Sequence, residues 1–240
     1  MAIFAARTFA QSLYKGLLQL FYPELCVACQ YELPAGDSCF CMRCRLKLSP
    51  SDMYRLPENE FTERFWGRLA LTGGAAMYYF TRKSPIQRAL HRLKYKNQPD
   101  IGLKLGREFG QLLLQAPHFQ NIDYIVPIPL HPKKERMRGY NQSAMFAQGL
   151  AESLGAVHLP HALARNTQTA TQTRKKRMDR FSNVETVFCV RQASLLESRH
   201  ILLVDDVLTT GATLEMCAQT LQQVPGIQLS MATIAIAMKS

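Results

Sequence analysis

Apolar runs alternate with segments of helical period through the last three quarters of the chain. The apolar runs predict strands over residues 74–80, 122–130, 184–190, 200–206 and 227–238. Segments whose apolar positions recur every three or four residues predict helices over residues 84–96, 101–116, 141–155 and 212–224. Strands that are apolar on both faces are typical of a parallel sheet covered by helices. The sequence therefore predicts an α/β domain with a mostly parallel sheet flanked by helices.

Three of the predicted helices carry end signals. Ser84 and Pro85 suit the cap and first turn of the first helix, and Asp100 is expected to cap the second. Gly155 is expected to end the third, because glycine readily adopts the left-handed conformation found after helices. The run over 122–130 is expected to enter a proline-rich loop. Ligands of such sheets bind beyond the carboxyl ends of the strands, so we look for a site there.

A polar stretch over residues 49–60 separates this pattern from the N-terminal region and is expected to be a linker. The chain has 240 residues, 47% of them hydrophobic, which is enough for one sizeable core and a small satellite domain. We therefore expect two units. Residues 1–60 would hold an amphipathic helix, a cysteine cluster and the linker, and residues 61–240 would form the α/β domain.

The first twenty residues have a helical period. We favour a helix docked on the protein over one lying on a membrane surface. Arg7 and Lys15 interrupt the apolar block that a secretory signal would need. No uncharged run reaches the roughly 18–20 apolar residues of a transmembrane helix. We expect a soluble, cytoplasmic protein.

The N-terminal region contains two CxxC pairs, separated by eleven residues. Two such pairs bring four thiolates around one ion in the tetrahedral geometry that suits Zn²⁺. The predicted ligands are Cys26, Cys29, Cys41 and Cys44. A fifth thiol, Cys39, could compete with Cys41. The zinc is expected to be structural, because four thiolates leave no open position. Cys189 and Cys217 are expected to be small core residues.

Positive charge is concentrated in three runs. Residues 82–96, 133–138 and 174–180 together carry +13, whereas the whole chain carries +11, so the remainder carries −2. Such runs can be merely solvated surface. Three runs that hold the entire excess favour an anionic ligand, either the phosphates of a nucleotide or a nucleic acid backbone.

The stretch ILLVDDVLTTGAT, residues 201–213, ends a predicted buried strand on two carboxylates. Carboxylates at such a place are costly without partners. The loop that follows lies over a helix N-terminus, where Gly211 allows close backbone approach and Thr209, Thr210 and Thr213 supply hydroxyl groups. This is an anion site of one-phosphate size beside acceptors for two vicinal hydroxyls. A ribose with a 5-phosphate would satisfy both halves. A capped strand-to-helix turn alone would not explain the Asp pair.

This stretch resembles the phosphoribosyl pyrophosphate (PRPP) loop of type I phosphoribosyltransferases. Together with the cysteine pairs and RGYNQ, residues 138–142, it is similar to the ComF family, which joins a zinc knuckle to such a domain. IVPIPLHPKKERMRGYNQ resembles that family's pyrophosphate-side loop. KSPIQRALHRLKYKNQPDIG resembles its preceding helix, and RNTQTATQTRKKRMDRFSNV its flexible arm. The resemblance covers nearly the whole chain.

The resemblance implies a type I phosphoribosyltransferase fold and roles for several residues. Asp205 and Asp206 would hold the ribose hydroxyls and are the catalytic candidates. The PRPP loop would comprise Asp205, Asp206, Val207, Leu208, Thr209, Thr210, Gly211, Ala212 and Thr213. The pyrophosphate side, with Mg²⁺ bridging, would comprise Pro129, Leu130, Lys133, Lys134 and Arg138. The flexible arm and nucleic-acid surface would comprise Arg88, Arg92, Lys94, Lys96, Arg174, Lys175, Lys176 and Arg177.

Two functions from different classes fit these features. The ComF resemblance implies a PRPP-binding protein of natural transformation that handles single-stranded DNA, alone or with other uptake or recombination proteins. The alternative is an active phosphoribosyltransferase with a small-molecule acceptor. Tyr78, Tyr79 and Phe80 could stack an acceptor base, although a core strand is the favoured interpretation. Tyr95 and Tyr140 lie among basic residues, a modest indication of single-stranded nucleic acid binding. A third reading makes the zinc knuckle a docking module for a helicase or another uptake component.

Overall fold

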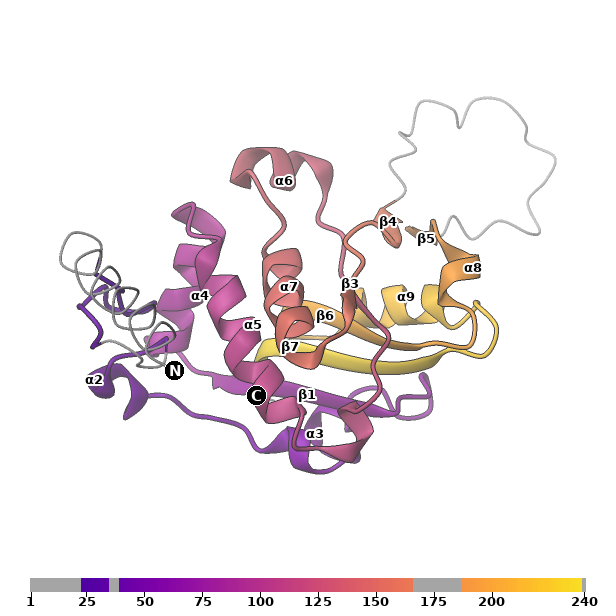
Figure 1. Ribbon diagram of the computed structural model, residues 1–240, viewed down its shortest axis with the longest axis horizontal. Helices are drawn as coiled ribbons and strands as arrows, with labels where there is room; N and C mark the ends of the chain where they lie inside the picture. The colour runs from indigo at the N-terminus through magenta and orange to yellow at the C-terminus, as the bar shows by residue number, and fades with distance from the viewer. Residues whose placement is uncertain (1–22, 35–38, 166–186, 239–240) are drawn as a thin grey trace, which may run out of the picture.

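The protein is built around one parallel five-stranded sheet. A computed structural model describes residues 23–34, 39–165 and 187–238 (Figure 1). The sheet has the order β1-β7-β6-β2-β3, and every neighbouring pair is parallel. Its strands are β1 (Gly73–Phe80), β2 (Tyr124–Pro127), β3 (Val157–His158), β6 (His200–Leu208) and β7 (Gln228–Ala237). The predicted parallel α/β architecture is therefore confirmed.

The longer helices form where the sequence predicts them. They are α4 (Pro85–Tyr95), α5 (Asp100–Leu113), α7 (Gln142–Leu154) and α9 (Ala212–Leu221). Ser84 caps α4 by accepting a hydrogen bond from the backbone N–H of Gln87 at 3.2 Å. Gly155 follows α7 in the left-handed conformation. The expected cap at Asp100 is wrong, because Asp100 already lies in the first turn and Pro99 occupies the cap position.

The loop expected after residue 130 contains a helix, α6 (Pro132–Arg138). His131 caps it by accepting a hydrogen bond from the backbone N–H of Lys133 at 3.2 Å. Pro132 starts the helix, and Gly139 ends it with a positive φ of 81°. These are ordinary helix start and stop signals, but seven residues are too few for an apolar period to be visible.

One of the predicted strands lies outside the main sheet. The run expected over 184–190 gives β5 (Phe188–Val190), which pairs antiparallel with β4 (Leu163–Arg165). The remaining elements of the described chain are short: α2 (Met42–Arg45), η1 (Met53–Arg55), α3 (Glu60–Glu63), η2 (Pro117–Phe119) and α8 (Ala193–Leu196). The amphipathic helix predicted for the first twenty residues lies outside the described residues. Across the described ranges, no helix is long and apolar enough to cross a membrane.

The stretch predicted to be a linker packs along β1, at the edge of the sheet. The backbone N–H of Ser51 donates to the carbonyl of Met77 at 3.0 Å, and the Ser51 hydroxyl donates to the carbonyl of Ala76 at 2.7 Å. Met53 and Tyr54, within this stretch, are buried. This polar stretch therefore forms hydrogen bonds with an edge strand. The domain boundary between residues 60 and 61 stays a prediction.

Two helices of the core touch through their backbones. Gly102, Gly106 and Gly110 line one face of α5, opposite Gly149 of α7. A Cβ atom on Gly106 would lie 2.3 Å from the carbonyl oxygen of Phe146, so no side chain fits there. This contact fixes α7, whose first turn reaches the carboxyl end of the sheet.

Because of this close contact, we expect the Gly106→Ala substitution to destabilise the protein. In an exposed helix, glycine to alanine stabilises by roughly 1 kcal/mol. Here the added methyl group meets backbone atoms that must move apart, and overpacking costs about 1–3 kcal/mol. Urea unfolding should show a lower free energy of unfolding for the variant. Gln111→Ala, at an exposed position of the same helix, should change it by less than about 0.5 kcal/mol. An unchanged or higher stability for Gly106→Ala would contradict the close packing.

Candidate functional site

Asp205 and Asp206 lie where β2 leaves the sheet. The last residue of β2, Pro127, pairs with Val204. β6 continues to Leu208 because β7 pairs with it on its other side. The strand therefore runs two residues beyond its predicted end, and the Asp pair lies within it. The missing neighbour on the β2 side opens the space that the two carboxylates share.

Asp205 is held by two hydrogen bonds. Its carboxylate accepts from the Ser143 hydroxyl at 2.9 Å and from the backbone N–H of Asp206 at 2.8 Å. Burial and the neighbouring charge of Asp206 nevertheless raise the pKa of Asp205 to about 7. The protein partners of Asp205 therefore offset its charge only in part.

Asp206 is buried and paired with Lys94. The Lys94 ammonium group lies 3.0 and 2.9 Å from the two carboxylate oxygens. Lys94 belongs to α4 and was predicted for a nucleic-acid surface. Its position ties the last turn of α4 to the acidic pair instead.

The loop after β6 has the geometry of an anion site. Thr209 and Thr210 are exposed, and Gly211 has a φ of +85°, in the left-handed region that favours glycine. Gly211 occupies the cap position of α9 and has no side chain to cap the helix, and the Thr210 hydroxyl accepts a hydrogen bond from the backbone N–H of Ala212 at 3.4 Å. The backbone N–H groups of the first turn are therefore oriented towards the loop, together with the positive end of the helix dipole.

A segment around α3 supports this loop from behind. The Arg64 guanidinium donates to the carbonyl of Thr209 at 2.7 Å and also to the carbonyl of Ala237. The Phe65 ring packs against Gly211, where a Cβ atom would lie 3.0 Å from it. Arg68 forms an ion pair with Glu215, in the first turn of α9, at 3.1 Å. Sequence reasoning missed these residues, because nothing in the sequence links residues 64–68 to a loop 145 residues away.

A cavity of about 230 Å³ lies over the acidic pair. Its lining includes four cationic and two acidic side chains, which is a formal excess of positive charge: Lys94, Lys134, Arg138, Arg165, Asp205 and Asp206. Of the other predicted residues, Pro129, Leu130 and Thr213 line it. Lys133 and residues 207–212 do not line it. Arg165 and His131 line it without having been predicted as site residues.

The rim of this cavity is tied to two helices. Asn141 donates from its side chain to the carbonyl of Ile128 at 2.9 Å, and Arg138 donates to the side-chain oxygen of Gln142 at 2.8 Å. The hydroxyl of Tyr140 donates to the carbonyl of Leu93. The RGYNQ stretch therefore joins α4, α6 and α7 around the cavity.

The four predicted zinc ligands converge. The sulfur atoms of Cys26, Cys29, Cys41 and Cys44 all lie within 4.8 Å of one another. Four sulfurs bound to Zn²⁺ at about 2.3 Å in a tetrahedron lie about 3.8 Å apart, so the cluster fits this ion with small adjustments. Cys39 is buried outside the cluster, near Glu108. Burial and Glu108 raise the pKa of Cys39, which disfavours the thiolate that a metal needs.

The cluster also favours one thiolate. Burial disfavours ionisation of Cys26, but backbone hydrogen bonds from Cys29, Cys41 and Ala28 outweigh it and lower the pKa of Cys26 to about 7. Burial and the neighbouring thiols raise the pKa of Cys44 to about 12. Crowded thiols of this kind ionise together only when a cation joins them.

Several other residues singled out in the sequence can also be located. Tyr78 is buried in β1, edge-on to Phe40, so the core interpretation of that strand is confirmed. Cys217 is buried as expected, whereas Cys189 is only partly so. Arg88 and Arg92 lie on α4 beside the cysteine cluster, Lys96 directly follows α4, and none of the three lines the acidic cavity. Arg174, Lys175, Lys176 and Arg177 lie outside the described residues.

Comparison with known proteins identifies relatives along most of the chain. DNA utilization protein YhgH of Escherichia coli K12 is 30% identical over 224 residues, covering 84% of this chain and 92% of that protein. Competence protein F of Haemophilus influenzae is 26% identical over 225 residues, covering 87% and 89%. Competence protein ComFC of Bacillus subtilis is 28% identical over 218 residues, covering 89% and 85%. No protein-family model matches the chain.

Two solved structures are more distantly similar. The allosteric regulatory enzyme of purine biosynthesis has a TM-score of 0.40 and 16% identity, covering 59% of this chain and 29% of that one. A hypoxanthine phosphoribosyltransferase from Staphylococcus aureus has a TM-score of 0.30 and 17% identity, covering 57% and 63%. This chain thus spans less than two thirds of either enzyme.

The family assignment rests on the sequence relatives and is consistent with two features of this chain. One relative reaches 30% identity over 92% of its length. The four-cysteine cluster and the acidic strand with its threonine loop both form as the sequence predicts. The chain belongs to the ComF family of competence and DNA utilization proteins.

Proposed function

We propose that this protein binds PRPP in the cavity at Asp205 and Asp206 and handles single-stranded DNA during DNA uptake, in the cytoplasm. The observation that carries the proposal is the juxtaposition in that cavity. Two carboxylates lie beside a helix N-terminus and face four cations. A ribose that carries a phosphate at one end and pyrophosphate at the other would meet complementary groups at each position.

Each part of PRPP has partners of the right chemistry. The carboxylates would accept hydrogen bonds from the two ribose hydroxyls, and the loop over residues 209–213 would hold the 5-phosphate. Lys134, Arg138 and Arg165 would neutralise the pyrophosphate. Asp205 and Asp206 would hold Mg²⁺ near the ligand, where the ion would offset the charge of the pyrophosphate, since paired carboxylates with a raised pKa favour a nearby cation.

The lining of the cavity favours binding over transfer to a base. Among the described residues that line it, none is Phe, Tyr or Trp, and His131 is the one aromatic ring on which an acceptor base could stack. We propose that the site senses or holds PRPP and that the protein acts with other DNA-uptake or recombination proteins. An active phosphoribosyltransferase would instead release pyrophosphate when a base or nucleotide is added.

The names of the relatives support the biological setting. They refer to DNA utilization in Escherichia coli and to competence in Haemophilus influenzae and Bacillus subtilis. The basic runs supply the charge that a DNA backbone requires. The cysteine cluster would hold a structural Zn²⁺ that stabilises the N-terminal region.

The double substitution Asp205→Asn and Asp206→Asn should abolish PRPP binding without unfolding the protein. The amides keep the shape but lose the charge-assisted hydrogen bonds, so affinity should fall about 100-fold or more, equivalent to about 3 kcal/mol. Calorimetry with Mg²⁺ and PRPP measures this loss. Asp52→Asn, at an exposed position paired only with Arg55, should bind as the unsubstituted protein does. Unchanged affinity in the double variant would place PRPP elsewhere.

The purified protein should contain one zinc ion per chain. Cys41→Ser should remove it and lower the melting temperature, because metal binding contributes folding energy to a segment with a small core. Cys39→Ala is the matched control and should keep the full zinc content. Elemental analysis and thermal unfolding measure both effects. A zinc-free protein, or loss of zinc only in Cys39→Ala, would contradict the assigned ligands.

A further inference from the structure

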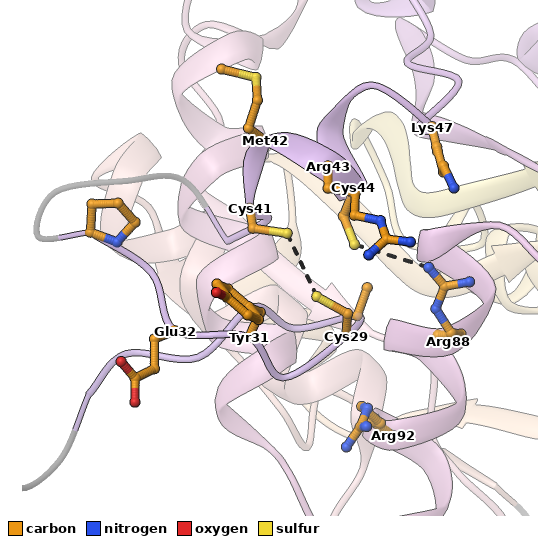
Figure 2. Close-up of a pocket in the computed structure, with 12 residues that line it drawn as sticks. Cys29, Tyr31, Glu32, Cys41, Met42, Arg43, Cys44, Lys47, Arg88 and Arg92 are labelled. Atoms are coloured by element: carbon orange, nitrogen blue, oxygen red, sulfur yellow. Dashed lines mark hydrogen bonds between the residues drawn. The ribbon is translucent and has the colours of Figure 1, made fainter.

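A second cavity lies between the cysteine cluster and α4, away from the acidic pair. It is an open groove of about 1000 Å³ (Figure 2). One wall is the cluster itself, through Cys29, Cys41 and Cys44, and the other is the exposed face of α4. The groove has no role in holding PRPP, because it shares no lining residue with the cavity at Asp205.

The groove is lined by cations that lack acidic partners. Arg43 and Lys47 come from the cluster side, and Arg88 and Arg92 from α4. A neighbouring hollow of about 330 Å³ continues past Arg92 to Lys96. Among the described residues, none of these five cations forms an ion pair, and Glu32 is the one acid in the lining.

Some of the described cations elsewhere on the surface are paired. Lys104 lies 3.1 Å from Glu24, and Arg199 lies 3.3 Å from Asp123. A zinc-loaded cluster with four thiolates would carry a formal charge of −2, and Arg88 is 4.0 Å from the Cys44 sulfur and would offset part of it. The remaining cations of the groove are then available to an external polyanion.

The groove also exposes one aromatic ring and one methionine side chain. Tyr31 is 74% exposed and Met42 is 66% exposed, and both line it. An exposed tyrosine beside a row of cations is the arrangement that binds unpaired bases, because each base has a face to stack while its phosphate lies on the charge. A duplex would present phosphates but no free base face, and an acidic peptide would present carboxylates without a regular series of bases between them.

We propose that this groove is the track for single-stranded nucleic acid, with phosphates on Arg43, Lys47, Arg92 and Lys96 and one base stacked on Tyr31. The inference rests on the proposed function and specifies where the strand lies. The track ends on α4 beside Lys94, which pairs with Asp206. The same helix therefore forms a wall of both sites.

Charge reversal tests the track. We would measure the anisotropy of a labelled fifteen-nucleotide thymidine strand with Arg43→Glu, Arg92→Glu and the control Arg191→Glu, each of which changes the net charge equally. Arg191 is exposed and directly follows β5, at the opposite end of the molecule from α2 (Figure 1). The two groove variants should bind at least tenfold more weakly and with a flatter salt dependence. The control should bind as the unsubstituted protein does, and all three should keep their affinity for PRPP.

A second variant separates stacking from charge. Tyr31→Ala should weaken strand binding about tenfold and leave competition by inorganic polyphosphate unchanged. If a uridine RNA strand bound as tightly as the thymidine strand, the result would support the same stacking and charge contacts and would show that the 2′-hydroxyl is not recognised. If polyglutamate competed with the strand as well as polyphosphate does, and Tyr31→Ala had no effect on strand binding, the proposal would be overturned in favour of an acidic peptide. Groove variants that bind DNA normally would also overturn it. An unsubstituted protein that binds no strand would refute the proposed function itself.

Discussion

The arrangement of this protein depends on two carboxylates held side by side at a gap in the sheet. Their mutual repulsion and burial raise the pKa of Asp205 to about 7, and a bound lysine offsets the charge of Asp206. The surrounding parts each contribute to holding this pair. The glycine contact between α5 and α7 positions Ser143, and the RGYNQ stretch ties the cationic rim to α4 and α7. Ser143, the backbone N–H of Asp206 and Lys94 offset part of the cost of burying this pair.

Helix α4 connects the two candidate sites. Lys94, on its last turn, reaches the acidic pair, whereas Arg88 and Arg92 face the cysteine cluster. A ribose bound to Asp206 would compete with the Lys94 ammonium group, so binding at the cavity would change the charge balance of the helix that lines the groove. This gives a physical route by which PRPP and a nucleic acid strand would affect each other, and it needs no contact between the two ligands.

Much of the fold and part of the site could be predicted from the sequence. Continuous apolar strands, Ser84 as a cap and Gly155 as a helix end are local signals, and the structure contains each of them. The two CxxC pairs are equally local. The contacts that the sequence analysis did not predict are tertiary contacts. The support of the loop by Arg64, the pairing of Lys94 with Asp206 and the inclusion of Arg165 in the cavity join residues far apart in the chain. No periodicity or spacing encodes such contacts.

The most direct test follows a labelled single strand by anisotropy, with and without saturating PRPP and Mg²⁺, and assays the same tubes for pyrophosphate. Our account predicts that the strand binds, that PRPP changes its affinity, and that no pyrophosphate is released. Release of pyrophosphate on addition of a base or nucleotide, with no strand binding, would contradict it. The basic residues would then serve the phosphates of a small substrate, and the protein would be a phosphoribosyltransferase.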